Sequence, residues 1–329
     1  MLSPTSDYET SSPNTFYFNQ SGPTEFVFWL LTISPKIQAL LFSFFLLLYM
    51  MIICSTTAII WATYTHTSLQ TPMYFFLSSL SFVEICYTTT SVPLMLSNIL
   101  RARKPIPLAG CATHMFFFGT LGSTDCFLMT VMAYDRYVAI CHPLQYTLIM
   151  TPQLCTQMVA GSLGLAVFLS LPLTSLIFTL PFCGCFLEIN HFFCDVPPVL
   201  NLACADILVP RAVLYVISTI VLTVPFLLIC ISYVFITITI LRIPSAEGRQ
   251  RAFSTCSSHL TVVLLQYGCG GLVYFRPPSS TPADEDWHLA LVYTFVTPLL
   301  NPIIYTLRNK DVKNALKKVI SKKAASENL

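Results

Sequence analysis

Few residues of this sequence could do chemistry, and the most unusual of them are acids in or beside long apolar runs. Glu84 lies deep in one run, and Asp125 lies deep in another. Asp135 and Arg136 are adjacent at the end of the second run. An ionised side chain in the middle of a bilayer costs about 2.5–3.5 kcal/mol or more, so such residues mark functional positions by default. The pattern indicates ion binding, proton sharing or a charge-based switch.

Glu84 and Asp125 are expected at similar depth. Counted along their helices from Pro72 and from Arg136, each lies about 16–18 Å from the same side of the membrane. Two carboxyl groups at one level would hold a monovalent cation between them or share a proton, because hard cations prefer oxygen ligands. The alternative is that one or both are protonated and only hydrogen-bonded.

Asp135 and Arg136 are predicted to lie where a helix leaves the membrane, because Pro143 prevents a regular helix from continuing much further. Near the end of the last apolar run, Asn301 precedes Pro302, which removes a backbone donor and lets the helix bend. An ordinary proline kink is the alternative to a functional hinge there.

Enzyme and metal chemistry find little support in the sequence. It has no Ser/His/Asp set, phosphate-binding glycine loop or HExxH motif. The stretch from His191 to Asp195 has the residue types of a metal site, but a disulfide through Cys194 would remove its thiolate. Cys183 and Cys185 are more typical of disulfide chemistry. We expect no enzyme and no cofactor, with a sodium ion between Glu84 and Asp125 as the one candidate.

The composition predicts a membrane protein that crosses the bilayer several times. Of 329 residues, 55% are hydrophobic and only 10% are charged, whereas soluble domains carry about 25% charged residues. The mean hydropathy is +0.70. Because the basic residues form no folded face with interleaved aromatic residues, nucleic acid is not expected as a partner.

Seven apolar segments each reach the roughly 20 residues that a membrane-crossing helix needs. We therefore expect an all-α bundle, followed by a short basic amphipathic helix at 309–320 on the membrane surface. The expected domains are an N-terminal tail (1–35), the membrane domain (36–307) and a C-terminal amphipathic segment and tail (308–329). The seven segments are 37–62, 72–98, 110–137, 154–178, 208–241, 253–275 and 287–306.

The orientation predicted is N-terminus outside, because most of the 17 lysine and arginine residues then face the cytoplasm. Arg101, Arg103 and Lys104 crowd one outer loop against this rule. The tail has no basic start followed by an apolar stretch, so we expect no cleaved signal peptide. Its sequon at Asn19 would accept a glycan only outside the cell.

The same orientation places an odd set of cysteines outside, where disulfides form. The connection 178–208 carries most of them and would be a lid over the bundle. The sequence alone leaves their pairing open, with one cysteine left over. The set is Cys111, Cys183, Cys185, Cys194 and Cys204.

Four motifs in order resemble those of olfactory receptors, a family of rhodopsin-like G-protein-coupled receptors. The resemblance runs from about Glu25 to Ile320, and Thr71 before the first motif resembles the tetrapod-type subgroup. The motifs are PMYFFL from Pro72, MAYDRY from Met132, AFSTCSSHL from Ala252 and PLLNPIIYTLRNK from Pro298.

The resemblance implies roles for individual residues. Arg136 would hold the inactive state and then contact the G protein, with Asp135 as its local partner and Tyr137 completing the motif. Tyr233 and Tyr305 would swing toward Arg136, while Asn301 and Pro302 form the helix-seven hinge. Two disulfides are implied, Cys111–Cys194 and Cys183–Cys204, which leaves Cys185 spare.

The resemblance also implies a ligand pocket in the outer half of the helices that contain 110–137, 208–241, 253–275 and 287–306. Plain helix packing is the alternative at each position. Because these residues carry no charge, the pocket suits small, mostly neutral volatile molecules. The expected lining is Phe118, Gly119, Gly122, Ser123, Cys126, Ser218, Val221, Tyr267, Gly271, Tyr274, Leu291 and Thr294.

Some positions depart from the family pattern. Its Gly-Asn in the first helix is Ser55-Thr56 here, its second-helix aspartate is Glu84, and the glutamine after the helix-three cysteine is His114. The polar network between helices one, two and seven would be rearranged, with an effect on basal activity or folding.

The function expected is an odorant receptor that activates a stimulatory G protein, raises cAMP and resides in the plasma membrane of sensory cilia. One alternative is a sodium- or proton-coupled secondary transporter, which would use the buried acids for coupling. It is disfavoured because no paired inverted halves are found. The others are a non-olfactory rhodopsin-like receptor and an olfactory-type receptor acting outside the nose.

Overall fold

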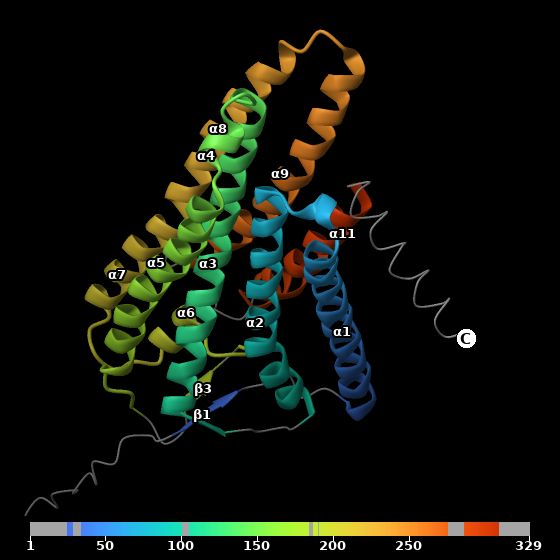
Figure 1. The fold of residues 1–329 in the computed structure, drawn as a ribbon. Coiled ribbons are helices and arrows are strands. Elements are labelled where there is room, and N and C mark those ends of the chain that lie inside the picture. The colour runs from blue at the N-terminus through green and yellow to red at the C-terminus, as the bar shows by residue number, and fades with distance from the viewer. Residues whose placement is uncertain are drawn as a thin grey trace, which may run out of the picture.

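Long helices run side by side in the computed structural model, which describes residues 25–28, 34–100, 105–183, 187–189, 191–275 and 286–308 (Figure 1). Within these residues, seven helical rods coincide with the seven expected segments to within several residues. The rods are α1 (Pro35–Thr65), α2 (Pro72–Leu100), α3 (Leu108–Cys141), α5 (Pro152–Phe178), α7 (Leu208–Ser218) continuing into α8 (Val224–Leu241), α9 (Ala246–Tyr274), and α10 (Asp286–Leu291) continuing into α11 (Thr297–Arg308).

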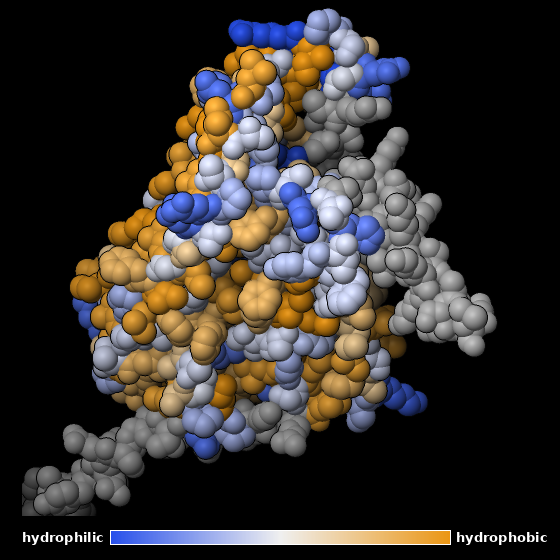
Figure 2. Space-filling model, viewed as in Figure 1, coloured by the Kyte–Doolittle hydropathy of each residue, from blue (hydrophilic) through white to orange (hydrophobic). Residues whose placement is uncertain are grey.

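The outer surface of the rods is suited to lipid. Four stretches, α1, α3, α5 and Leu208–Leu241, are long and apolar enough to cross a membrane. Large apolar side chains such as Leu40, Phe168 and Leu272 are exposed, at 70%, 71% and 62%. Figure 2 shows apolar residues over much of the side of the bundle and hydrophilic residues at the tip between α8 and α9. The chain is therefore a helical membrane protein that crosses the bilayer several times.

Two rods contain a π-helical turn just before a proline. The segment η2 (Thr219–Thr223) precedes Pro225, and η4 (Val292–Val296) precedes Pro298. Proline has no N–H to donate to the carbonyl four residues earlier, so the helical hydrogen-bond ladder must change locally. Pro93, Pro172 and Pro302 lie inside α2, α5 and α11 without such a segment.

A small sheet closes one end of the bundle, which the expectation of a purely helical chain did not include. The strand β1 (Glu25–Phe28) lies between β2 (Pro105–Pro107), to which it is antiparallel, and β3 (Leu187–Ile189), to which it is parallel. Because proline cannot donate to a ladder, β2 is suited to an edge. Phe26 and Phe28 are buried in the cluster beneath the sheet. The burial of these two side chains holds β1 against the end of the bundle.

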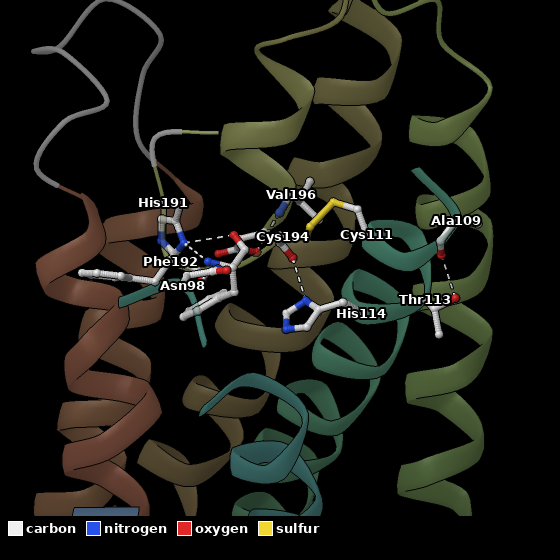
Figure 3. Close-up of a disulfide and its surroundings, with 11 residues drawn as sticks. Asn98, Ala109, Cys111, Thr113, His114, His191, Phe192, Cys194 and Val196 are labelled. Carbon is white, nitrogen blue, oxygen red and sulfur yellow. Dashed lines mark hydrogen bonds between the residues drawn. A yellow bond between two sulfur atoms is a disulfide. The ribbon is translucent and has the colours of Figure 1, made fainter. Parts of the chain in front are cut away.

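Two disulfides fasten the lid at the same end. Cys111 at the start of α3 is bonded to Cys194, and Cys183 to Cys204. Figure 3 shows the lid between His191 and Val196 lying across the helix ends beside this first disulfide. Asp195 then caps α6 (Val196–Leu200) by accepting the N–H of Val196.

The remaining elements are the short η1 (Thr67–Leu69) and α4 (Tyr146–Ile149), which lie in the connections after α1 and α3. Several predictions lie outside the described residues, namely the sequon at Asn19, the basic cluster 101–104, Cys185 and the amphipathic helix at 309–320.

Candidate functional site

A cavity of about 100 Å³ lies between the helices beneath the lid. A single buried water needs roughly 10–15 Å³, so the cavity has room for a small organic molecule. Residues of α2, α3, α5, α6, α7, η2, α9 and η4 line it, together with Asp195 of the lid. They are Tyr87, Met115, Phe118, Gly119, Gly122, Ser123, Cys126, Ser170, Leu173, Asp195, Val196, Leu214, Ile217, Ser218, Val221, Leu222, Gln266, Gly270, Tyr274 and Tyr293.

The lining includes most of the residues proposed from the sequence, but four lie elsewhere. The cavity brings together Phe118, Gly119, Gly122, Ser123, Cys126, Ser218, Val221 and Tyr274. Tyr267, Gly271, Leu291 and Thr294 are not among its lining residues.

The α3 wall is shaped by two glycines. A Cβ atom at Gly119 would lie 3.5 Å from the hydroxyl of Ser170, and one at Gly122 would lie 3.5 Å from the ring of Tyr87. A larger side chain at either position would therefore occupy the space between α3 and its neighbours. Because Gly119, Gly122 and Cys126 recur at helical spacing, they lie on one face.

On α9, the helix turns a different face to the cavity than expected: Gln266 and Gly270 line it in place of Tyr267 and Gly271. Gln266, Gly270 and Tyr274 follow each other one turn apart and line the cavity. Tyr267 instead donates its hydroxyl to the backbone oxygen of Cys126 at 2.8 Å. This contact joins α9 to α3 and fixes which face of α9 the cavity receives.

The lid supplies a carboxylate, a lining residue that the positions expected from the sequence did not include. Asp195 lines the cavity and is only 2% exposed. It accepts hydrogen bonds from Val196 N–H at 2.7 Å, from the Tyr274 hydroxyl at 2.9 Å and from the Tyr293 hydroxyl at 3.2 Å. Sequence reasoning considered Asp195 only as a metal ligand, and the described residues contain no cluster of three metal-ligating side chains.

Glu84 and Asp125 lie close enough for the charge of one to act on the other. Asn301 Nδ2 donates to Glu84 Oε1. Glu84 Oε2, Asp125 Oδ1 and Asn301 Oδ1 are buried without a hydrogen-bond partner among the described residues. Such a set of oxygen atoms fits a hard monovalent cation.

The unusual first-helix pair contributes little to that set. The Ser55 hydroxyl donates to the carbonyl of Met51 at 2.7 Å, and the Thr56 hydroxyl donates to that of Ile52 at 2.6 Å. Both hydroxyl donors therefore bond to the backbone of their own helix.

Arg136 lies near α9 at the opposite end of the bundle from the lid. It is 6% exposed, and its Nε has no partner in the described part of the chain. Its charge acts on Asp135, Cys256 and His259. Asp135 Oδ1 accepts a hydrogen bond from the Tyr146 hydroxyl of α4 at 2.8 Å.

The other predicted switch residues are only partly gathered here. Tyr233 of α8 is hydrogen-bonded to His259 Nδ1 of α9 at 2.9 Å, whereas Tyr137 contacts His142 Nε2 at 3.1 Å. Pro302 lies in α11, as does the backbone of Tyr305, whose side chain is outside the described residues. Sequence reasoning missed His259, although a histidine within an apolar run was a visible signal.

Comparisons with known proteins agree on one family. The family model of olfactory receptors matches residues 45–323. The chain is 73% identical to human olfactory receptor 10Q1 over 94% of its own length and 97% of that protein. It is 51% identical to human olfactory receptor 10V1, with 92% and 98% covered, and 47% identical to mouse olfactory receptor 10J5, with 91% and 96% covered. Given this agreement and the helical membrane fold, the chain belongs to the olfactory receptor family of G-protein-coupled receptors.

Proposed function

We propose that the chain is an odorant receptor that binds small, mostly neutral volatile molecules in the cavity beneath the lid. The observation that carries the proposal is the cavity itself. Aromatic rings, aliphatic side chains and glycines form most of its wall, and the one carboxylate, Asp195, is already bonded to three donors. Such a site binds an apolar body by dispersion and orients it with few hydrogen bonds.

Binding is transmitted by a shift between two arrangements of the helices. The ligand favours the state in which α9 lies further from α3, and that state exposes Arg136 to a stimulatory G protein that raises cAMP. A ligand shifts this equilibrium only by its difference in affinity for the two states. The support is the location of Arg136 against α9 together with the Tyr233–His259 contact between α8 and α9.

Glu84, Asp125 and Asn301 would hold a sodium ion that favours the resting state. Their oxygen atoms supply the ligands, and the ion would balance the charge of the two carboxyl groups. The ion supplies charge compensation only, while the side chains fix how α2, α3 and α11 meet.

The seven helical rods are proposed to cross the membrane with the N-terminus outside, a cytoplasmic amphipathic eighth helix, and residence in sensory cilia. The disulfide-bonded lid supports this orientation, because disulfides persist outside the cell. The same receptor chemistry is also compatible with expression of the chain outside the nose.

A cAMP reporter screen of the full chain against a panel of volatile compounds tests the function. At least one neutral compound should raise cAMP in a dose-dependent way, and cells lacking the stimulatory G protein should not respond. Arg136→Ala should remove the response at equal surface expression. A response that survives this substitution undiminished would contradict the role of Arg136.

A further inference from the structure

The cavity contains one amide in a wall that is otherwise mostly apolar. Gln266 lies in the middle of α9 and is 9% exposed. Its Oε1 atom is buried and has no hydrogen-bond partner among the described residues. A buried acceptor left without a donor loses its solvation without compensation. A ligand that brings a donor to this atom would therefore gain relative to one that does not.

The Gln266 amide contacts α3 through one neighbouring side chain. The Gln266 side chain interacts with that of Cys126 of α3, which also lines the cavity. Cysteine sulfur is a weak acceptor, so this contact suits the amide NH₂, and the carbonyl oxygen is the atom without a partner among the described residues.

The cavity keeps space next to this amide. The residue one turn further along α9 is Gly270, which places no side chain over Gln266. A Cβ atom at Gly270 would lie 3.2 Å from Leu222, which lines the cavity as well. Leu222 therefore packs against Gly270, and the room for the polar end of a ligand is the cavity that Gln266, Gly270 and Leu222 line together.

The charged acceptor of the cavity, unlike the Gln266 amide, is already occupied. Asp195 accepts from the hydroxyls of Tyr274 and Tyr293 and from the backbone of Val196. A ligand hydroxyl would have to displace one of these donors to reach Asp195. At Gln266 Oε1 the same hydroxyl would displace no donor of the described residues.

We propose that Gln266 is the specificity-determining residue of the cavity, and that its Oε1 accepts a hydrogen bond from the hydroxyl of a small alcohol or phenol. The apolar body of the ligand then lies between the glycine-rich wall of α3 and the aliphatic side chains of α7 and η2. This inference rests on the proposed function, because it takes the cavity as the odorant site.

Matched ligand pairs test the inference with the full chain in cAMP-reporter cells. Straight-chain alkanols, benzyl alcohol and simple phenols are each compared with their methyl ether, which keeps the oxygen but cannot donate. The wild type should respond to the hydroxyl compound at a concentration that is lower by about tenfold or more than that needed for the ether. Gln266→Leu should remove this preference at equal surface expression, mainly by weakening the response to the hydroxyl compound.

The matched control is Gln157→Leu, the same change at an exposed position of α5, which should keep the wild-type ratio. If Gln266→Leu does not reach the surface, Gln266→Met replaces it. A wild-type ratio near one overturns the inference without any variant, as does a ratio that Gln266→Leu leaves intact.

Gly122→Phe separates this inference from the proposed function. It should fill the cavity, because a Cβ atom there already contacts Tyr87, and it should suppress responses to alcohols and ethers alike. If Gly122→Phe suppresses responses while the Gln266 result fails, only the role of Gln266 is wrong. If no panel member activates the wild type, or Gly122→Phe changes nothing, the cavity is not the odorant site and both proposals fall.

Discussion

Tyr233 of α8 and His259 of α9 are joined by a buried hydrogen bond of 2.9 Å, and their rings are stacked with centroids 5.8 Å apart. The pair lies beside Arg136, whose charge acts on His259. A contact of this kind holds α8 and α9 together at the end where the G protein is proposed to bind. Activation by an outward movement of α9 would have to break or rearrange it.

Replacing His259 by Phe is expected to raise basal signalling. The phenyl ring keeps the stacking but leaves the buried Tyr233 hydroxyl without this partner, a loss of about 1 kcal/mol for the closed arrangement. Basal cAMP should rise severalfold at equal surface expression. His288→Phe, at an exposed position of α10, is the control. Unchanged basal cAMP in His259→Phe would show that this bond does not restrain α9.

Replacing Tyr146 by Phe is expected to weaken coupling. Burial, followed by the charge of Asp135, raises the pKa of the Tyr146 phenol, so the phenol stays protonated at neutral pH and keeps donating to Asp135. Without this donor, the Asp135 carboxylate should attract Arg136 more strongly. Odorant dose–response curves should shift severalfold to higher concentration at neutral pH. Tyr134→Phe, at an exposed position of α3 next to Asp135, should behave as wild type.

Asp125→Asn is expected to remove sensitivity to sodium. The substitution deletes one of the two interacting carboxyl groups. The site therefore loses a negative charge and one oxygen ligand for a monovalent cation. In the wild type, replacing external sodium by an impermeant organic cation should change basal or odorant-evoked cAMP about fivefold or more. The variant should show no such change, whereas Asp206→Asn in an exposed loop should retain it. Equal sodium responses in wild type and Asp125→Asn would exclude the cation site.

Phe26→Ala is expected to destabilise the lid. Phe26 is fully buried, and its ring makes edge contacts with Phe178 and Phe182 at 6.4 and 5.3 Å between centroids. Truncating a buried phenylalanine costs about 3–5 kcal/mol, so surface expression and thermal stability in detergent should both fall. Val27→Ala, on the less buried face of the same strand, should have a small effect. Equal losses in both variants would mean that the burial of Phe26 does not stabilise the lid.

The sequence alone determined the helical architecture and the face of α3 that meets the cavity. Apolar runs long enough for a bilayer predict helices because the backbone must satisfy its own hydrogen bonds there. On α3, the spacing of Gly119, Gly122 and Cys126 indicates one face of a single continuous helix. The acids Glu84 and Asp125 were identified for a related reason, because their cost in hydrocarbon makes them visible without a structure.

Only the tertiary structure decided the rest of the site. On α9, Gln266 with Gly270 and Tyr267 with Gly271 are equally spaced alternatives, and the choice is made by the contact of Tyr267 with Cys126 across to α3. Asp195 reaches the cavity because the disulfide of its neighbour Cys194 to Cys111 fastens the lid over the helix ends. The sheet likewise joins three segments far apart in the sequence. Periodicity specifies a face within one helix, whereas rotation between helices and the path of a loop depend on contacts between distant residues.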